Sequence, residues 1–471
     1  MIFKKLKVLS DDEMIRIVES AFRILRTTGC RFEDEQCMGE LASVGCDADR
    51  ETLIVKFPEE AIFDALENVP SVMPPDDHPK ARVAAANKGF ILDYELKKMR
   101  RGTTQDAMNA IVVSNALPNI TIASAGVVQE DVPNDAVEVF NTGMLMKYSE
   151  KLFHQWVYNT ENVPYVLEMA KIVTGGEEEL RQSKFLSYML NSITPLRFPP
   201  TQLKITRMYA QMDLPLSIAS MTQSGSSAPA TLAGSLVVCI AELLAGLVWV
   251  RSLKTKSAVG LGALTQAINM RTGNQLYAGP EQTMMFLGAH QIIRYLGYTS
   301  GNTCFETDSC DFDFQNGWEK ALSGALCWAA GFDMFGQAGF VMDGFSLEQL
   351  VLDDESLGML QRVGEGVIVD DDTLAFDVIK KVAQGGNFLG ERHTMKHARE
   401  NWLPTLFPRV SYEHWLKDGG RWIGDLAHEK VGRILAENSL ELQLSEDQAK
   451  AIDEIVARRV AEAGGSTQGV N

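Results

Sequence analysis

The sequence predicts an α/β fold, a (β/α)8 TIM barrel with helical extensions at its N-terminal and C-terminal ends. The chain has 471 residues and is 45% apolar, which is enough to bury one large core. From Gly89 onward, a short apolar run, a polar turn and an amphipathic helical segment follow one another repeatedly. Eight such alternations fill about 270 residues, as in a barrel whose short parallel strands are buried.

The predicted strands are the short apolar runs of this pattern. They span residues 90–95, 120–125, 151–157, 185–190, 215–221, 257–264, 298–303 and 332–338. The predicted helices follow them at 103–116, 134–149, 162–174, 201–212, 230–253, 280–296, 315–330 and about 346–361. Because barrels of this kind carry their chemistry where the strands end, we expect the active site at the carboxyl ends of these strands.

Three regions are expected along the chain. Residues 1–70 form a helical N-terminal cap with helices over 10–30, 34–43 and 58–67. Residues 71–362 form the barrel together with an extended connector over 70–90, which is rich in proline and charge. Residues 363–471 form a helical C-terminal extension, with helices at 371–383, 420–437 and 444–462 and a disordered tail of about seven residues.

Charge and composition exclude several classes of function. A net charge of -18 and a pI near 4.9 argue against nucleic acid and anionic membrane surfaces as partners. The first 14 residues lack the apolar stretch of a signal peptide, so we expect a cytoplasmic protein. The most apolar segment, 231–253, is interrupted by Glu242 and Arg251, which favours a buried barrel helix over a membrane span.

The seven cysteines indicate free thiols in a reducing compartment. Their number is odd and no CxxC pair occurs. Cys304 and Cys310 lie six residues apart, which is a poor spacing for a zinc pair, and we expect no metal ion there.

Amide and aromatic side chains predominate at the predicted strand ends, and acid–base groups are few. We expect these residues to bind a substrate: Phe153, His154, Gln155, Trp156, Asn191, Gln223, Gln266, Arg271, Asn302, Glu306, Phe335 and Gln337. No Walker loop, GxGxxG after a strand, GxSxG elbow or HExxH motif occurs, so nucleotide hydrolysis, hydride transfer and zinc hydrolysis lack their usual support. An aromatic, amide-rich and acidic pocket suits a cation without donatable protons, and a quaternary ammonium is the simplest such ligand.

Structural roles compete with these assignments. Phe153, Trp156 and Phe335 also fit ordinary barrel filling, and His154 also fits a hydrogen-bonded core histidine. Gln337 lies in an FGQAG turn, where the flanking glycines leave its amide free to point at a ligand. His393 and His397 share one face if their segment is helical, but two histidines without a third ligand make a poor metal site, so a structural role is favoured.

Longer motifs give the chain a resemblance to a known family. They are LSDDEMIRIVESAFRILRTTGCRFEDE near the start, ALPNI before the second strand, NSITPLRF, SGSSAPATLAGSL, NMRTGNQLYAGPEQ, SLEQLVLDDESLGML and GGNFLGERHTMKH. With these motifs in family order across nearly its whole length, the chain resembles the trimethylamine methyltransferase family. The resemblance implies a (β/α)8 fold and methyl transfer from an amine to a partner corrinoid protein, which carries the cofactor, so that the enzyme binds none permanently.

One departure from the family pattern bears on the substrate. The trimethylamine enzymes of the family carry pyrrolysine, whereas every residue here is standard and the last strand reads FDMFGQAG. The chain therefore resembles the branch without pyrrolysine, whose members demethylate quaternary amines. Glycine betaine is the first expectation; proline betaine, carnitine or another trimethylammonium acid is an alternative, and so is a non-catalytic betaine-binding protein.

Catalysis by positioning alone is expected. A neutral amine leaves a quaternary nitrogen without being protonated, so no catalytic side chain is required. A betaine needs a second contact for its carboxylate, for which Arg271 and Arg197 are both candidates, although an ion pair is favoured for Arg197. The corrinoid protein requires a broad, partly apolar surface at the barrel mouth, and a homo-oligomer is compatible with the sequence.

Overall fold

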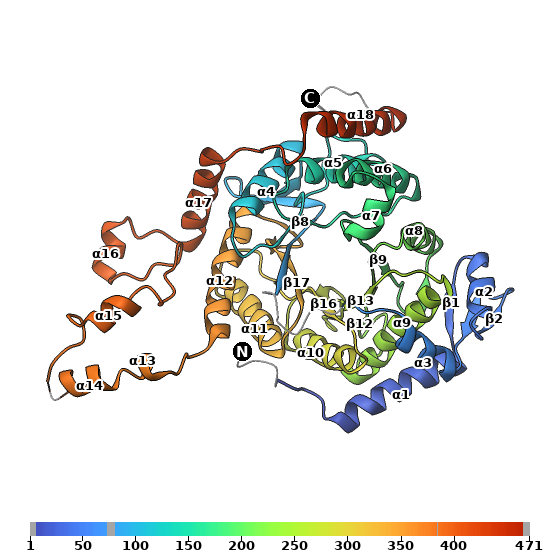
Figure 1. Cartoon of the computed structure of the whole chain (residues 1–471), viewed down its shortest axis with the longest axis horizontal. Helices are drawn as coiled ribbons and strands as arrows, with labels where there is room; N and C mark the ends of the chain where they lie inside the picture. The colour runs from blue at the N-terminus through green and yellow to red at the C-terminus, as the bar shows by residue number, and fades with distance from the viewer. Residues whose placement is uncertain (1–5, 73–80, 384, 465–471) are drawn as a thin grey trace.

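The computed structural model describes residues 6–72, 81–383 and 385–464. A ring of helices encloses a central sheet, α1 to α3 lie at one edge of the ring, and α13 to α16 lie outside it (Figure 1). Part of the predicted connector, residues 73–80, and the predicted disordered tail, residues 465–471, fall outside the described residues.

The central sheet has eight parallel strands. In chain order they are β4 (Arg82–Ala85), β7 (Ile122–Ala123), β8 (Leu152–Phe153), β9 (Tyr188–Asn191), β11 (Leu216–Ser220), β13 (Val259–Ala263), β16 (Ser300–Asn302) and β17 (Met334–Ala338). Their order in the sheet is β8-β7-β4-β17-β16-β13-β11-β9, so that the last strand of this sheet in chain order, β17, pairs with its first, β4. The sheet is curled, and among the described residues no ladder joins β8 to β9.

Side chains bridge the two edges of this sheet. The Phe153 ring on β8 packs edge-on against Phe185 before β9, with ring centres 5.5 Å apart. The Gln155 amide donates a hydrogen bond to the Ser187 carbonyl. β8 has two residues, which leaves little backbone to form a ladder, so contact across this seam is made by side chains.

The helices of the ring match the predicted segments. They are α4 (Thr104–Ala116), α5 (Val137–Tyr148), α6 (Val163–Thr174), α8 (Pro200–Gln211), α9 (Leu232–Ser252), α10 (Pro280–Tyr295), α11 (Phe314–Ala330) and α12 (Leu347–Glu365); a further helix, α7 (Glu177–Ser183), precedes β9. Local signals fix several ends. Thr103 caps α4 with a capping box, and Asp313 caps α11, which ends where Gly331 adopts a left-handed conformation.

The first strand differs from the prediction. The strand predicted at 90–95 is β5 (Phe90–Asp93), which forms a hairpin with β6 (Lys98–Arg101) at the rim. The first strand of the parallel sheet is β4, inside the predicted connector. Its sequence, RVAA, is short and rich in alanine, so it reads as less strand-like than FILD.

The N-terminal cap contains a small sheet as well as helices. Besides α1 (Asp11–Thr27), α2 (Glu35–Ala42) and α3 (Glu59–Asn68), it holds β1 (Cys30–Phe32), β2 (Asp47–Asp49) and β3 (Ile54–Lys56). β1 pairs with β10 (Arg197–Phe198), which ties the cap to the segment after β9. The three predicted helices of the cap are present, and the prediction missed the small sheet because strands of three residues lie below the length at which alternation is visible.

The apolar helix α9 is buried, as predicted. Among the described residues it is the one helix long and apolar enough to cross a membrane. Of its most apolar 18-residue stretch, 78% is buried inside the fold. The Glu242 carboxylate on α9 accepts hydrogen bonds from the hydroxyls of Ser192, Thr194 and Ser220 and from the Leu196 amide. An acidic residue inside an apolar helix thus fixes the loops that follow β9 and β11.

The C-terminal region contains α13 (Asp371–Leu374), α14 (Phe376–Val382), α15 (Arg392–His397), α16 (Tyr412–Lys417), α17 (Ile423–Glu437) and α18 (Glu446–Glu462). The helices predicted at 420–437 and 444–462 are α17 and α18. On the ring, α17 packs against α12, and α18 packs against α5 and α6. The helix predicted at 371–383 is broken at Ala375, whose φ is 52°. The region boundaries at 70 and 362 remain predictions.

Candidate active site

Buried polar groups without partners gather at one end of the sheet. Eleven buried side-chain nitrogen or oxygen atoms of the described residues lack a hydrogen-bond partner. Eight of them belong to residues at, or a few positions after, the carboxyl end of each of the eight parallel strands: Asn87, Gln129, Trp156, Asn191, Thr222, Thr265, Asn302 and Gln337. An unmet buried polar group costs about 1–3 kcal/mol. Their concentration at this end marks it as the candidate binding site, hereafter the mouth.

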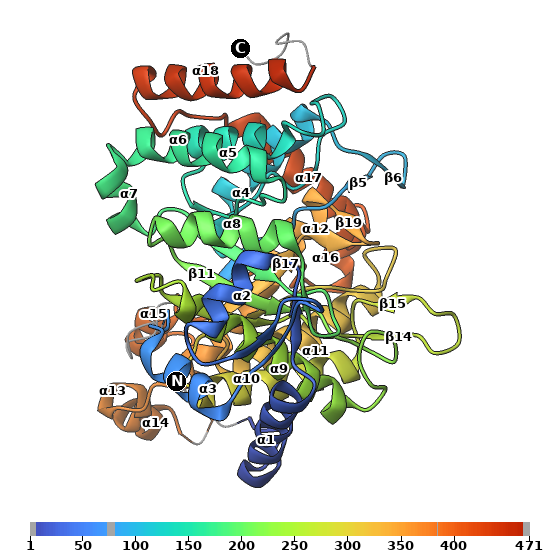
Figure 2. The same ribbon diagram turned by 90° about the vertical axis from the view of Figure 1, so that its right-hand side faces the viewer.

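Two hairpins mark the side on which the mouth lies. The hairpin of β14 (Gln266–Ile268) and β15 (Gln275–Leu276) follows β13, and β5 and β6 follow β4. Figure 2 shows both hairpins on the same side of the molecule. Two surface hollows, one beside α3 and α9 and one between α6 and α18, contain none of the unpaired atoms.

Gln337 on β17 is held in a strained conformation. Its φ is 72°, in the left-handed region, and the register of β17 against β4 shifts between Phe335 and Ala338. The neighbouring backbone is fixed on both sides: the Phe305 amide donates to the Gly336 carbonyl at 3.3 Å, and the Gly339 amide donates to Asp353 Oδ2 at 2.7 Å. This bulge leaves the Gln337 side-chain oxygen buried and unpaired.

Asn302 lies on β16, next to β17. Its Oδ1 accepts a hydrogen bond from the Cys304 thiol, while its Nδ2 is buried without a partner. Gly336 on β17 approaches this strand closely, since a Cβ placed there would lie 3.2 Å from the Asn302 carbonyl oxygen. The free donor of Asn302 and the free acceptor of Gln337 are therefore presented by adjacent strands.

An aromatic row follows β8. The rings of His154 and Trp156 are 5.9 Å apart in an edge-on arrangement, and Trp156 stacks on Tyr158 with ring centres 6.4 Å apart. Burial, with a smaller effect of Arg82, lowers the pKa of His154 to about 4, so the imidazole is neutral at pH 7. The row therefore offers apolar and π surface, one free indole N–H and no positive charge.

Opposite charges lie at the mouth, Lys88 after β4 and Glu306 after β16, and each acts electrostatically on the other. Glu306 is buried, and its carboxylate accepts hydrogen bonds from Thr303 at 2.8 Å and Gln282 at 3.2 Å. Burial raises the pKa of Glu306 to about 7, against the opposing effect of Lys88. A carboxyl group with this pKa at strand ends is a candidate functional group.

Lys88 provides the positive charge. Its Nζ lies 4.4 Å from the centre of the Phe340 ring and 5.8 Å from that of Tyr277. No described residue forms a hydrogen bond or ion pair with this ammonium, although Glu306 and Asp343 act on it electrostatically. Burial lowers the pKa of Lys88. Three N–H donors in a half-buried position are thus free for an anionic group.

Three residues predicted to bind the substrate make other contacts or are exposed to solvent. Gln155 donates to Ser187 and lies 3.5 Å from the Tyr209 hydroxyl. The Phe335 ring packs on Trp328 at 5.5 Å, facing α11 and the core. Arg271 is exposed at the tip of the β14–β15 hairpin, where its backbone amide donates to Asn269.

The remaining predicted residues lie at or near the mouth. Gln223 precedes the loop to α9 and donates to Gln275 Oε1 at 2.6 Å, and Gln266 is buried on β14. Phe153 forms part of the seam between β8 and β9. The other carboxylate candidate, Arg197, pairs with Glu33 at 2.7 Å in the N-terminal sheet, which is the ion pair that the sequence favoured.

Lys88 is the residue that sequence reasoning missed. With the first strand placed at 90–95, residue 88 falls before a strand; with β4 at 82–85, Asn87 and Lys88 follow its carboxyl end. The pattern RVAAANKG contained this signal, because a small apolar run ends in polar residues and glycine.

The thiols are free, as predicted. All seven cysteines are unpaired, and Cys304 is buried whereas Cys310 is exposed. The Cys304 thiol donates a hydrogen bond to Asn302 Oδ1. Among the described residues, neither Cys304 nor Cys310 belongs to a cluster of three side chains that could bind a metal ion.

The chain is similar to known methyltransferases. A family model described as trimethylamine methyltransferase matches residues 2–464. A glycine betaine methyltransferase of Desulfitobacterium hafniense strain Y51 is 28% identical over 475 residues, covering 98% of each chain. A trimethylamine methyltransferase of strain DCB-2 of that species is also 28% identical, over 97% of this chain and 94% of its own. A crystal structure of Methanosarcina barkeri monomethylamine methyltransferase aligns with a TM-score of 0.47 and 13% identity, covering 91% of this chain and 88% of that chain.

Proposed function

Because the chain belongs to the trimethylamine methyltransferase family, we propose that it transfers a methyl group from a quaternary amine to the Co(I) corrinoid of a separate corrinoid protein. The substrate we propose first is glycine betaine. The two relatives named above are equally identical to this chain, so identity does not choose between a betaine and trimethylamine.

The single observation that carries the betaine assignment is the pair of opposite charges at the mouth. Glycine betaine is a zwitterion, with a trimethylammonium group at one end and a carboxylate at the other. Glu306 and the aromatic row after β8 suit the cationic end, and the free donors of Lys88 suit the carboxylate. Trimethylamine has no anionic end to occupy Lys88.

The residues of this chain act by positioning. The partner's corrinoid supplies the nucleophile that accepts the methyl group. The bond between the methyl carbon and nitrogen breaks with its electron pair left on nitrogen, so the nitrogen of the product is that of a neutral tertiary amine and no proton moves. Trp156 and Asn302 have free donors at the mouth, and Gln337 has a free acceptor there, so these groups would orient the substrate and displace water from it.

We also propose that the eight strands act as one closed barrel. The order of the sheet and the pairing of β17 with β4 are those of a barrel, and the Phe153–Phe185 and Gln155–Ser187 contacts bridge the seam. We further propose that the reaction takes place in the cytoplasm, a compartment that suits the seven free thiols.

The corrinoid protein is proposed to dock on the apolar rim of the mouth. Phe314 and Trp318 lie in the first turns of α11, the helix that follows β16 in the chain, and their stacked rings are 84% and 60% exposed. Met270, at the tip of the β14–β15 hairpin, is 70% exposed. Exposed aromatic and methionine side chains beside a binding site favour contact with another protein.

The test is a methyl-transfer assay. The purified protein is mixed with a reduced corrinoid protein and a panel of amines comprising glycine betaine, proline betaine, carnitine, choline and trimethylamine, and the spectral change of the corrinoid on methylation is followed. We expect glycine betaine to react fastest. Turnover of trimethylamine alone would overturn the quaternary-amine assignment. Betaine binding without methylation would favour the alternative of a non-catalytic betaine-binding protein.

A further inference from the structure

The segment of residues 366–421, hereafter the C-terminal arm, has almost no core of its own. It contains α13 to α16 and lies outside the ring of helices (Figure 1). Among its described residues Val382 alone is buried, and α13, α15 and α16 bury no residue. Hydrophobic packing within the arm therefore contributes little to fixing its short helices relative to one another.

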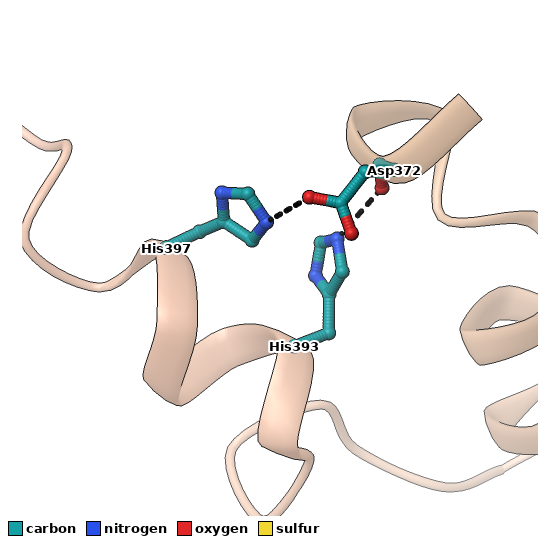
Figure 3. Close-up of side chains that lie close together, drawn as sticks. All are labelled: Asp372, His393 and His397. Atoms are coloured by element: carbon teal, nitrogen blue, oxygen red, sulfur yellow. Dashed lines mark hydrogen bonds and ion pairs between the residues drawn. The ribbon is translucent and has the colours of Figure 1, made fainter. Parts of the chain in front are cut away.

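Side chains from two of these helices meet at one point. His393 and His397 lie one turn apart on α15, and their ring centres are 4.3 Å apart. Asp372 on α13 faces both: its carbonyl oxygen lies 2.9 Å from His393 Nε2, and its Oδ2 lies 3.1 Å from His397 Nε2 (Figure 3). One ligand atom from each of the three side chains lies within 4.8 Å of the others.

We infer that Asp372, His393 and His397 bind a divalent transition-metal ion, with Zn²⁺ the best-suited candidate. Two histidines at i and i+4 on one helical face with a carboxylate are a common donor set for such ions. At zinc–ligand distances of about 2.0–2.1 Å, tetrahedral ligand atoms are ~3.3 Å apart, so the present set closes by small rotations of side chains. Because the cluster is partly exposed, the fourth position is open to solvent.

A fourth side chain orients one of the proposed ligands. Glu400 Oε1 lies 2.5 Å from His397 Nδ1, on the opposite side of the ring from the nitrogen that faces Asp372. A carboxylate hydrogen-bonded to one nitrogen of a histidine fixes the ring and makes the other nitrogen a better ligand. The cluster thus has a second layer of contacts as well as three ligands.

Lys396 competes with the ion for Asp372. Its ammonium lies 2.5 Å from Asp372 Oδ2, the oxygen that also faces His397. In the metal-free protein this contact balances the carboxylate, and an incoming cation displaces it. Removal of the lysine charge is therefore predicted to tighten metal binding, whereas it would weaken a cluster that is only an ion-pair network.

The ion is proposed to fasten the arm. It would join α13 to α15, between which Val382 is the one buried residue of the described chain, and so replace a core that the arm lacks. The inference does not rest on the proposed methyl transfer, because the three residues lie outside the helix ring and the binding test uses no amine and no corrinoid protein.

The experiment measures Zn²⁺ affinity of the full chain by competition with a chromophoric chelator, after chelator treatment and dialysis. We expect one site per chain, and His393→Ala or His397→Ala to weaken it roughly 100-fold or more. His414→Ala, which removes a histidine of the arm that contacts Ser411, is the matched control and should leave the affinity unchanged. Equal losses in all three variants, or no stoichiometric binding, would overturn the assignment.

Two further measurements separate the metal site from an ion-pair network. Lys396→Ala should bind Zn²⁺ several-fold more tightly, and unchanged or weaker binding would count against the site. Co²⁺ should give the visible absorption of a four-coordinate ion in the parent protein and lose it in His397→Ala. Limited proteolysis should show the arm protected by Zn²⁺ in the parent and in His414→Ala, but not in His393→Ala, and protection in all three would contradict the role of the arm histidines.

Discussion

The Lys88 ammonium nitrogen lies 4.4 Å above the centre of the Phe340 ring and has no hydrogen bond or ion pair among the described residues. An ammonium group that packs on a ring face and has unused N–H donors can donate hydrogen bonds to a carboxylate. This relationship makes Lys88 the first residue to test.

Lys88→Gln should weaken glycine betaine binding and spare choline. A hydrogen bond to a charged group contributes about 1.5–3 kcal/mol, so the loss is expected to be roughly 10- to 150-fold. Choline shares the trimethylammonium group but has no carboxylate, and its affinity should change little. Isothermal titration calorimetry compares the two ligands. Arg271→Gln removes an exposed cation at the hairpin tip and serves as the matched comparison; a large loss there and none at Lys88 would reverse the assignment.

Binding of quaternary amines should strengthen as the pH rises through about 7. The ionised form of Glu306 attracts the cation, and burial raises the pKa of this carboxyl to about 7. Glu306→Gln should bind more weakly at pH 8 and lose most of this pH dependence. An unchanged pH profile in Glu306→Gln would show that another group governs binding.

Glu306 should also shape the dependence of stability on pH. Its folded-state pKa of about 7 lies above the reference value of 4.5, so the folded protein holds this proton more tightly. The contribution to stability is complete below pH 4.5 and is lost as the pH rises through 7, with a magnitude of roughly 3 kcal/mol at most. Denaturant unfolding between pH 5 and 8 should show a smaller fall for Glu306→Gln than for the parent. Equal falls in the two proteins would refute this contribution.

Replacing Gln337 should affect the stability of the protein and its binding of substrate in different ways. Glycine adopts a φ of 72° without strain, so Gln337→Gly should raise the free energy of unfolding by about 1 kcal/mol, whereas Gln337→Ala keeps the strain. Both variants remove the free amide oxygen, and both should raise KM more than they lower kcat. Denaturant melts and steady-state kinetics measure the two effects; a fall in kcat with KM unchanged would instead assign Gln337 to the chemical step.

Phe314 and Trp318 should contribute to binding of the corrinoid protein. Replacing both with alanine is expected to raise the concentration of corrinoid protein needed for half-maximal rate by roughly tenfold or more, because exposed aromatic anchors often contribute at least ~1 kcal/mol each. Glycine betaine affinity should remain as in the parent. Leu389→Ala changes an equally exposed apolar residue on the C-terminal arm and is the control. A similar effect of both changes would argue against a docking site at the mouth.

Much of the ring could be predicted from sequence because its signals are local. The helices α6, α8 and α11 have periodic apolar positions, and others begin or end at capping residues such as Thr103 and Gly331, which act within a few residues. The first strand was misplaced because RVAA carries little β signal beside FILD. The small sheet of the N-terminal cap was not predicted because each of its strands has only two or three residues.

The candidate site was predicted in outline. Asn191, Asn302 and Gln337 do lie at strand ends, since the carboxyl end of a parallel strand is set by the strand itself, and their role in binding a substrate stays a prediction. The direction of a side chain is a different matter. Phe335 and Gln337 lie two positions apart, yet a bulge between them means that alternation along the strand does not decide where each points.

The sequence by itself determined the helices of the ring, seven of the eight strands of the parallel sheet, the free thiols and the family, because these depend on local pattern and on motifs in series. Tertiary structure decided which distant groups meet. It placed Lys88 beside Phe340, 252 positions along the chain, and brought Asp372 to His393 and His397, where the sequence did not reveal a third member for the proposed metal site. Such meetings depend on how strands pair and chain segments turn, and no periodicity within one segment encodes them.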